Sequence, residues 1–171
     1  MLFRSYTVLV SPSTLALNSW MYAKLPYDAL RDLAPITQIA TIPNSLVVHP
    51  SLPVKSVPDF IALAKKQPGA INVGSAGVGT SPHLSLELFK ALAKVDLVHV
   101  PYKGSGVAVI AHLSGEIIAQ FPSLATTMSY LRSGRLRILG VTTAKRSPFL
   151  PDVPAIGEFV PGYEATQWFG F

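Results

Sequence analysis

The 171-residue sequence contains no cysteine, and only 13% of its residues are charged. The lack of cysteine excludes a disulfide framework and any metal site built from thiolates. Lysine and arginine outnumber the acidic residues by 14 to 9, which gives a formal charge of +5. These basic residues are scattered and match no nucleic-acid-binding motif, so the charge favours a general attraction for small anions and no nucleic-acid partner.

Long hydrophobic runs are also absent, although 49% of the residues are apolar. Proline, glycine, histidine or lysine interrupts each apolar stretch within a few residues, so no segment is predicted to insert into a membrane. The apolar residues are therefore expected to form a substantial core, and a disordered chain is excluded.

The first five residues, Met1-Leu2-Phe3-Arg4-Ser5, lack the apolar segment and the cleavage site of a signal peptide. Leu-Phe-Arg-Ser is also the translation of the end of a common sequencing adapter. We therefore expect residues 1–5 to be an assembly artefact and the natural sequence to begin at Tyr6. Resequencing the locus and finding the same five codons would contradict this expectation.

The central part of the chain alternates short apolar segments with amphipathic ones. Strands are predicted at residues 46–49, 71–73, 97–100, 117–121 and 136–142, with four helices between them. The helix at 82–93 is predicted to turn Leu84, Leu88, Ala91 and Leu92 toward the core. This alternation predicts an α/β lobe with a mainly parallel sheet, whose ligands bind beyond the carboxyl ends of the strands.

The two flanking segments do not make a complete domain. Residues 6–44 predict strands at 6–10 and 36–42 with a short helix at 15–22, and residues 143–171 are proline-rich before an apolar end. We interpret residues 1–45 as part of a first domain and 46–142 as a second domain. Residues 143–171 would then cross back into the first domain, which is interrupted at both ends.

A glycine-rich loop joins the predicted strand at 71–73 to the predicted helix, with Ser81 as the expected N-cap and Pro82 as the first helical residue. Glycine lets the backbone approach a ligand, and the free N–H groups and dipole of a helix start favour an anion. An ordinary glycine-rich turn is the alternative. The candidate ligand-binding residues of this loop are Gly74, Ser75, Ala76, Gly77, Gly79, Thr80 and Ser81.

Three enzymatic motifs do not fit this loop. A phosphate-binding P-loop requires lysine where the sequence has Thr80, and a dinucleotide fingerprint requires glycine where it has Pro82. A nucleophile elbow around Ser75 requires glycine where the sequence has Val73. These departures count against a nucleotide-binding or hydrolytic enzyme.

The titratable residues form no catalytic arrangement. The four histidines contain no i, i+4 pair, and no two acidic residues are placed for acid–base chemistry. His83 follows the loop and is expected to stay neutral and make one hydrogen bond, whereas His49 and His99 are interpreted as structural. Tyr102 and Lys103, in the loop after the next strand, are further candidate ligand-binding residues, and Lys103 is suited to neutralise a carboxylate. We predict no catalytic residue, no metal ligand and no cofactor.

Several strings of the sequence, in order from Tyr6 to Phe171, resemble those of a known family. That family is the Bug family, the substrate-binding proteins of tripartite tricarboxylate transporters. The strings are Leu25-Pro26-Tyr27-Asp28, Leu46-Val47-Val48-His49-Pro50, Asn72-Val73-Gly74-Ser75-Ala76-Gly77, His99-Val100-Pro101-Tyr102-Lys103-Gly104, Ala144-Lys145-Arg146-Ser147-Pro148, Leu150-Pro151-Asp152-Val153-Pro154 and Trp168-Phe169-Gly170.

The resemblance implies a type II periplasmic-binding-protein fold, with one complete parallel-sheet lobe and fragments of a second lobe in this chain. It implies a periplasmic location, a membrane permease as partner, and a small carboxylate held by backbone N–H groups and hydroxyls, often through waters, from one loop of each domain. The second-domain loop corresponds to Gly74 through His83. The first-domain residues that correspond are Ser11, Ser13 and Thr14, and the other first-domain loop has no counterpart here.

One position departs from the family pattern, because many members carry an aspartate where this sequence has Pro122. An aspartate there is suited to pair with a ligand ammonium group, so we expect a dicarboxylate, tricarboxylate or aromatic carboxylate instead of an amino acid. The leading interpretation is an extracytoplasmic receptor that passes this ligand to a permease. The alternative is a phosphate- or oxyanion-binding α/β enzyme that uses the Gly74–Ser81 loop.

For the chain by itself we expect weak or absent binding. We also expect an exposed apolar surface, prone to aggregation, where the first domain is incomplete.

Overall fold

The computed structural model describes residues 8–171, which divide into two compact units. One unit comprises Ile42–Thr166, and the other comprises the described residues up to Thr41 together with Gln167–Phe171. The expected artefact at residues 1–5, and the first two residues of the strand predicted at 6–10, lie outside the described residues.

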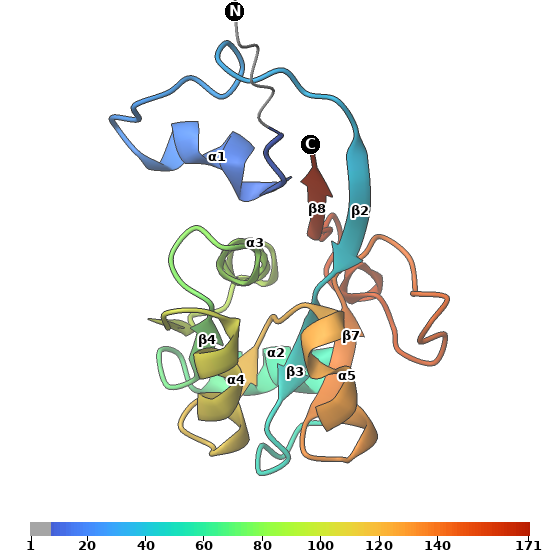
Figure 1. Ribbon diagram of the computed structural model, residues 1–171. Coiled ribbons are helices and arrows are strands. Elements are labelled where there is room, and N and C mark those ends of the chain that lie inside the picture. Colours follow the sequence, from blue (N-terminus) through green and yellow to red (C-terminus); the bar gives the residue numbers. More distant parts are fainter. Residues whose placement is uncertain (1–7) are drawn as a thin grey trace, which may run out of the picture. The chain divides into compact units, whose positions relative to one another are not determined.

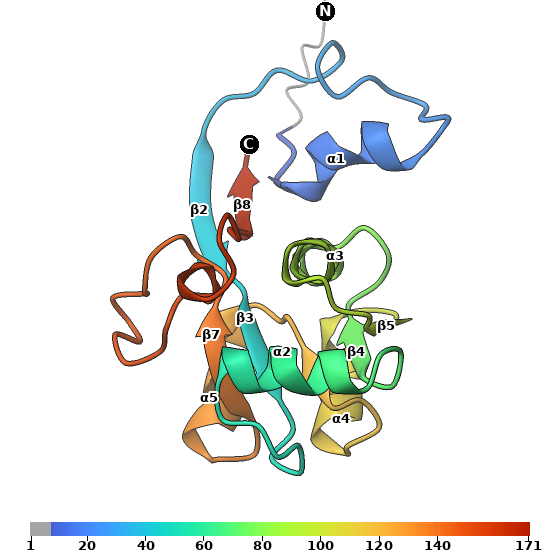
Figure 2. The ribbon, with the colours of Figure 1, turned by 180° about the vertical axis from the view of Figure 1, so that it is seen from behind.

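The Ile42–Thr166 unit is built on a five-stranded sheet of order β5-β4-β6-β3-β7. Helix α2 crosses one face of this sheet, and α4 and α5 cover the other (Figures 1 and 2). The strands are β3 (Ser45–Val48), β4 (Asn72–Ser75), β5 (Val98–Pro101), β6 (Ala119–Gln120) and β7 (Arg137–Val141). The helices are α2 (Val57–Lys66), α3 (Ser81–Ala93), α4 (Ser105–Leu113), α5 (Leu124–Arg132) and the 3₁₀ turn η1 (Ile156–Glu158).

The sheet is mainly parallel, as predicted, but it contains one reversed strand and is therefore mixed. Strand β4 pairs parallel with β5 and β6, whereas β3 pairs antiparallel with both β6 and β7. The chain enters the unit at Ile42 and passes directly into β3 at the edge where the parallel strands end. Strand β3 therefore runs against its neighbours, and Asn44 at its start lies at the carboxyl edge of the other strands.

Helix α3 buries a face that only partly overlaps the predicted one, since Leu88 packs against the core but Leu92 does not. Its buried residues include Ser85, Leu86 and Phe89, whereas Leu92 is 39% exposed. The Phe89 ring lies 5.9 Å from that of Phe60, 5.5 Å from Phe121 and 6.0 Å from Tyr163. Burial of this one large ring against three other aromatic rings selects the face of the helix, and the leucine stripe next to it stays partly exposed.

The segment after β7 belongs to this core. Ile156, Val160 and Tyr163 are buried in the same cluster as the side chains of α2 and α3. The compact unit therefore extends to Thr166, further than the predicted segment 46–142.

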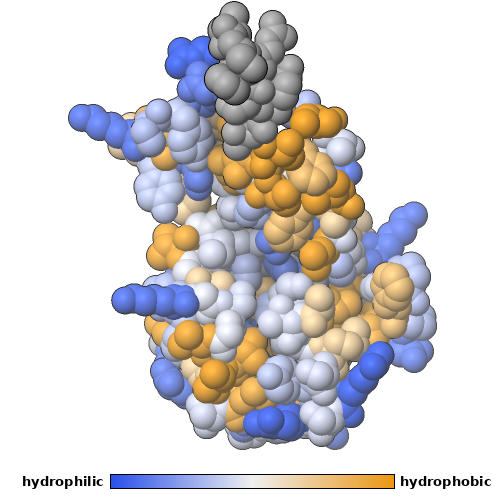
Figure 3. All heavy atoms as spheres, in the orientation of Figure 1, coloured by the Kyte–Doolittle hydropathy of each residue, from blue (hydrophilic) through white to orange (hydrophobic). Residues whose placement is uncertain are grey.

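The other unit contains a three-stranded sheet of order β1-β8-β2 and one short helix. Its elements are β1 (Ser11–Pro12), α1 (Thr14–Met21), β2 (Gln38–Pro43) and β8 (Thr166–Gly170), and the last two cross the boundary between the units. None of residues 8–41 is buried, and Figure 3 shows apolar side chains on the visible face of this part. The largest exposed ones include Val8, Leu9, Val10, Trp20 and Leu30.

The strand predicted at 6–10 is not present in its described part. Val8, Leu9 and Val10 belong to no strand, and the pairing starts at Ser11 and Pro12, opposite Gly170 and Phe169. The three residues are β-branched or apolar, but among the described residues no neighbouring strand is available to them, so their composition alone does not make a strand.

Candidate functional site

Five connections meet at the carboxyl edge of the sheet in the Ile42–Thr166 unit. The glycine loop follows β4, Tyr102 follows β5, Pro122 follows β6 and Thr142 follows β7, while Asn44 precedes the antiparallel β3. Backbone hydrogen bonds join them, from Ser45 N–H to Pro122 O and from Thr142 N–H to Asn44 O, both at 3.0 Å. These two bonds join the connections at Asn44, Pro122 and Thr142 into one polar network.

Glycine is required in the loop between β4 and α3. Gly77 and Gly79 have φ values of 134° and 78°, which residues with a side chain rarely adopt. A Cβ atom on Gly77 would also lie 3.3 Å from the carbonyl oxygen of Tyr102. The loop after β5 is tied to this one, because the N–H groups of Tyr102 and Gly104 donate to Ser75 O and Ala76 O.

The start of α3 presents unused backbone donors. Thr80 is the N-cap and makes no side-chain cap bond, since its Oγ1 donates to Gly77 O at 2.7 Å. Ser81 is thus the first helical residue, one position earlier than predicted. Four N–H groups make none of the hydrogen bonds found among the described residues, those of Ala76, Val78, Ser81 and His83. Donors of this kind at a helix N-terminus favour an anion.

His83 closes this loop as a neutral side chain. Its Nδ1 accepts from Gly79 N–H at 3.1 Å, so the ring proton lies on Nε2, which is 3.9 Å from Glu87 Oε1. Its ring stacks on that of His99, with centroids 4.1 Å apart. Burial lowers the pKa of His83. Burial, and then the repulsion that a second proton would meet from His83, lower the pKa of His99. This geometry agrees with the expectation that His83 is neutral and makes one hydrogen bond.

Ser75 pairs with His99, a contact that no local sequence pattern predicts. Ser75 Oγ lies 2.6 Å from His99 Nε2, donates to Gly77 O and accepts from Gly77 N–H. The Ser75 side chain is 0% exposed. A hydroxyl that no substrate can reach is not suited to nucleophilic attack, so this serine–histidine pair shapes the loop.

Asn44 is the polar residue of the site that sequence reasoning missed. It is 0% exposed and donates from Nδ2 to Ser81 Oγ at 2.6 Å and to Ser85 Oγ at 3.0 Å. Thr142 holds its backbone, accepting from Asn44 N–H and donating from Oγ1 to Asn44 O, each at 3.0 Å. These partners lie 37 to 98 residues away in the sequence, so no local pattern indicates them.

The remaining predicted site residues lie in two places. Tyr102 turns its hydroxyl to Glu116 at 2.7 Å, and burial with this bond raises the pKa of Tyr102 to about 12. The Lys103 side chain is exposed in the same loop. Ser11, Ser13 and Thr14 belong to the other unit, where Ser11 is in β1, Ser13 caps α1 and Thr14 begins it. Gly74 is buried below the loop in β4.

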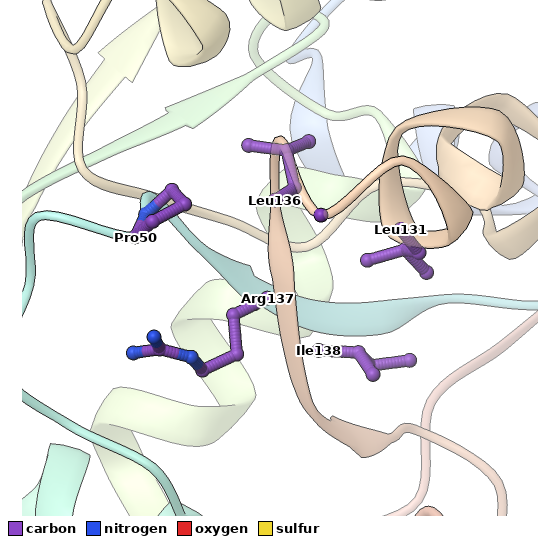
Figure 4. Close-up of a pocket in the computed structure, with 6 residues that line it drawn as sticks. Pro50, Leu131, Leu136, Arg137 and Ile138 are labelled. Atoms are coloured by element: carbon purple, nitrogen blue, oxygen red, sulfur yellow. The ribbon is translucent and has the colours of Figure 1, made fainter.

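Other features of the described residues add no second site. Within residues 8–171, no group of three or more His, Cys, Asp or Glu side chains is placed to hold a metal ion, and no helix is long and apolar enough to cross a membrane. A shallow hollow at the opposite end of the sheet is lined by Pro50, Leu131, Gly134, Leu136, Arg137 and Ile138 (Figure 4). Arg137 already donates to Leu52 O and Val54 O there.

Comparison with known proteins gives a consistent result. Residues 4–171 match the model of the TctC family, described as the tripartite tricarboxylate transporter family receptor. Protein BugT of Bordetella pertussis is 34% identical over 96% of this chain and 51% of its own length. The structure titled R. palustris Rpa4515 with adipate is 41% identical, with a TM-score of 0.83 over 87% of this chain and 50% of that one.

A second structure, MatC (Rpa3494) from Rhodopseudomonas palustris with bound malate, is 27% identical with a TM-score of 0.82. It is matched over 94% of this chain and 55% of its own. The chain thus spans about half the length of the relatives that it matches.

Proposed function

This chain belongs to the tripartite tricarboxylate transporter receptor family, which includes the Bug proteins, and from that premise we propose that it is part of a periplasmic receptor for a small carboxylate. The receptor would bind its ligand and pass it to the permease subunits of a tripartite transporter. The family match supports the transport role, and the relatives with adipate and with malate support a carboxylate as the ligand class.

The observation that carries this proposal is the start of α3. The backbone N–H groups of Ala76, Val78, Ser81 and His83, in the glycine loop and the first turn of α3, make none of the hydrogen bonds found among the described residues, and α3 has no side-chain cap bond. A carboxylate accepts several such hydrogen bonds, and hydrogen bonds to a charged group are stronger than neutral ones. The helix dipole adds to the attraction. In this proposal the carboxylate replaces the missing cap of α3.

We propose a ligand without an ammonium group. Pro122 lies at the same edge as Asn44, and its carbonyl oxygen accepts from Ser45 N–H. Proline contributes no negative charge at this position, so a ligand ammonium group would be left without a partner there. A dicarboxylate, tricarboxylate or aromatic carboxylate therefore fits this edge better than an amino acid.

The proposed protein binds its ligand without transforming it. The enzymatic alternative needs a nucleophile or a base that reaches the ligand, and the Ser75–His99 pair is closed from solvent at Ser75. His83 Nδ1 already accepts from Gly79 N–H, which leaves that nitrogen unavailable as a base.

The experiment is a titration of the chain with adipate, malate, citrate and benzoate, with glutamate as the amino-acid comparison. Ligand that binds the folded state raises the unfolding temperature by mass action. Because Ser11, Ser13 and Thr14 represent only part of the first-domain contribution, millimolar concentrations are appropriate. We expect a rise with one of the four acids and none with glutamate. No response to all four acids, by the folded product of the whole gene as well as by this chain, would contradict the proposal.

Two glycine variants locate the response. Gly77→Ala strains the glycine loop, whereas Gly134→Ala strains a turn before β7, at the other end of the sheet. Both glycines have positive φ, so both variants lower the stability for the same reason. We expect only Gly77→Ala to abolish the ligand-induced rise in unfolding temperature. Equal loss in both variants would show that the ligand does not bind at this loop.

A further inference from the structure

The orientation of Asn44 is fixed by its backbone. Thr142 Oγ1 lies 3.0 Å from both Asn44 N and Asn44 O, and the Thr142 N–H also donates to Asn44 O. Asn44 and Thr142 are both 0% exposed. The side chain of Asn44 therefore leaves the start of β3 in one direction, toward α3.

The side-chain amide of Asn44 uses both of its protons on α3. Nδ2 donates to Ser81 Oγ, in the first residue of the helix, and to Ser85 Oγ, one turn further on. Each serine oxygen accepts one of these bonds, so each serine keeps its own hydroxyl proton for another partner. Ser81 is 8% exposed and Ser85 is 1% exposed, so the Ser81 proton is the one nearer to solvent.

The amide orientation has a physical reason. Asn44 Oδ1 is buried without a partner among the described residues. With the amide reversed, Oδ1 would accept both serine protons and the two N–H groups would be left unpaired in its place. The serine hydroxyls can rotate toward another partner, whereas the two N–H groups of a reversed amide would be fixed and unpaired in the buried position of Oδ1, so the orientation shown is the less costly one.

We propose that Asn44 is a positioning residue of the ligand site, whose amide keeps the hydroxyl proton of Ser81 free to donate to the bound carboxylate. This inference rests on the proposed function. It makes the first turn of α3 a surface of donors alone, with the N–H groups of Ser81 and His83 beside the Ser81 hydroxyl. A carboxylate accepts hydrogen bonds and donates none, so such a surface selects for it.

The first measurement needs no ligand. The two side-chain N–H protons of Asn44 should exchange slowly with solvent in nuclear magnetic resonance spectra, unlike those of Asn72, which is exposed in β4. Ser81→Ala should accelerate exchange of the Asn44 protons at least tenfold. Fast exchange of the Asn44 protons in the native chain would overturn the proposed orientation.

The second measurement is a titration of the native chain and of variants with adipate, followed on the backbone signals of Ala76, Val78, Ser81 and His83. Asn44→Asp keeps the shape of the side chain but turns it into an acceptor of both serine protons. We expect Asn44→Asp and Ser81→Ala to weaken adipate binding about tenfold or more, the loss that follows from one hydrogen bond to a charged group.

The matched control is Tyr163→Phe. The Tyr163 hydroxyl donates to Ser85 O at 3.0 Å, in the same buried region, and no hydrogen bond among the described residues joins Tyr163 to Asn44 or Ser81. This variant should lower the unfolding temperature and leave the adipate affinity unchanged. If Asn44→Asp also lowered only the unfolding temperature, Asn44 would be a structural residue and the inference would fail while the proposed function stood. If neither this chain nor the folded product of the whole gene responded to adipate at these four signals, the proposed function would fail, and proton exchange would still test the orientation of Asn44.

Discussion

His112 gives the clearest effect at the scale of a single residue. Its side chain is 0% exposed in α4, and neither ring nitrogen has a hydrogen-bond partner among the described residues. Burial, followed by the charge of His49, lowers the pKa of His112 to about 4. The unfolded chain binds a proton with a pKa near 6.5, so stability falls as the pH drops from 6.5 toward 4.

We expect the titration of His112 to lower the free energy of unfolding by about 2 kcal/mol between pH 7 and pH 5, since each pKa unit corresponds to about 1.4 kcal/mol. The contacts of the His112 ring with Ile118 and Gln120 are too weak to count as hydrogen bonds by geometry, so His112→Leu should unfold within about 1 kcal/mol of the native chain at pH 7. Urea unfolding at both pH values checks this. The pKa values of His83 and His99 are also lowered, so both residues still reduce stability at low pH in the variant. His112→Leu should therefore lose less stability between pH 7 and pH 5 than the native chain, but still some. An unchanged pH dependence would contradict the assignment.

Single residues of the site differ in how far the sequence predicts them. The glycine loop is predictable because glycine and the helix-start signals lie within one short segment. Asn44 and His99 are not, because their partners Ser81 and Ser75 are distant in the sequence and only the fold brings them together. A prediction from local pattern therefore finds the loop but misses Asn44 and His99, whose side chains bond to it.

At the scale of elements, the start of α2 offers a direct test of capping. Ser56 is the N-cap, and its side chain accepts from Asp59 N–H at 3.2 Å. Ser56→Ala should cost about 1 kcal/mol in urea unfolding. Ser123 is the N-cap of α5 but makes no side-chain cap bond, so Ser123→Ala is the matched control and should cost less. Equal costs would show that the Ser56 bond contributes nothing.

The packing of α3 gives a second test at this scale. Phe89→Ala removes a fully buried ring from contact with three aromatic rings and should cost about 3–5 kcal/mol. Leu92→Ala, on the partly exposed stripe, should cost about 1 kcal/mol or less. Comparable losses in the two variants would mean that the leucine stripe is the core face after all.

Elements were predicted well in order and less well in direction. Apolar segments bounded by proline and glycine indicate each strand and α-helix between Ser45 and Val141 within a few residues, but not the 3₁₀ turn η1. The direction of β3 could not be predicted in this way. A run of buried residues such as Leu46, Val47 and Val48 indicates only that both faces of the strand are covered, and it does not indicate which way the strand runs. Its reversal follows from where the chain enters the unit, which is a property of the whole molecule.

At the scale of the whole molecule, the two units differ in how much they bury. The buried apolar residues begin at Leu46, whereas Trp20 is 89% exposed and Leu30 is 95% exposed. Regions with few buried apolar contacts open at low free energy and are cut first by proteases. Brief chymotrypsin digestion should therefore cut near Trp20 or Leu30 and leave a fragment that contains 42–166, identified by mass spectrometry. First cuts within α2 or α3 would contradict this.

The division into domains stays a prediction at this scale. The sequence places a boundary near residue 45 because the regular alternation starts there, and near 142 because it stops there. Proline-rich segments such as 143–166 carry no periodic signal, yet Ile156, Val160 and Tyr163 pack into the core. Composition therefore does not reveal which body an irregular segment joins.

The place of β3 in the sheet affects how the chain acquires its structure during synthesis. Val47 pairs with Gln120 and with Ile138, so β3 emerges from the ribosome many residues before either of its partners. Contacts so distant along the chain close slowly. Until β6 and β7 have been translated, Leu46, Val47 and Val48 remain unpaired apolar strand surface. The nascent chain is therefore expected to depend on chaperones that hold this segment until about residue 141 has emerged.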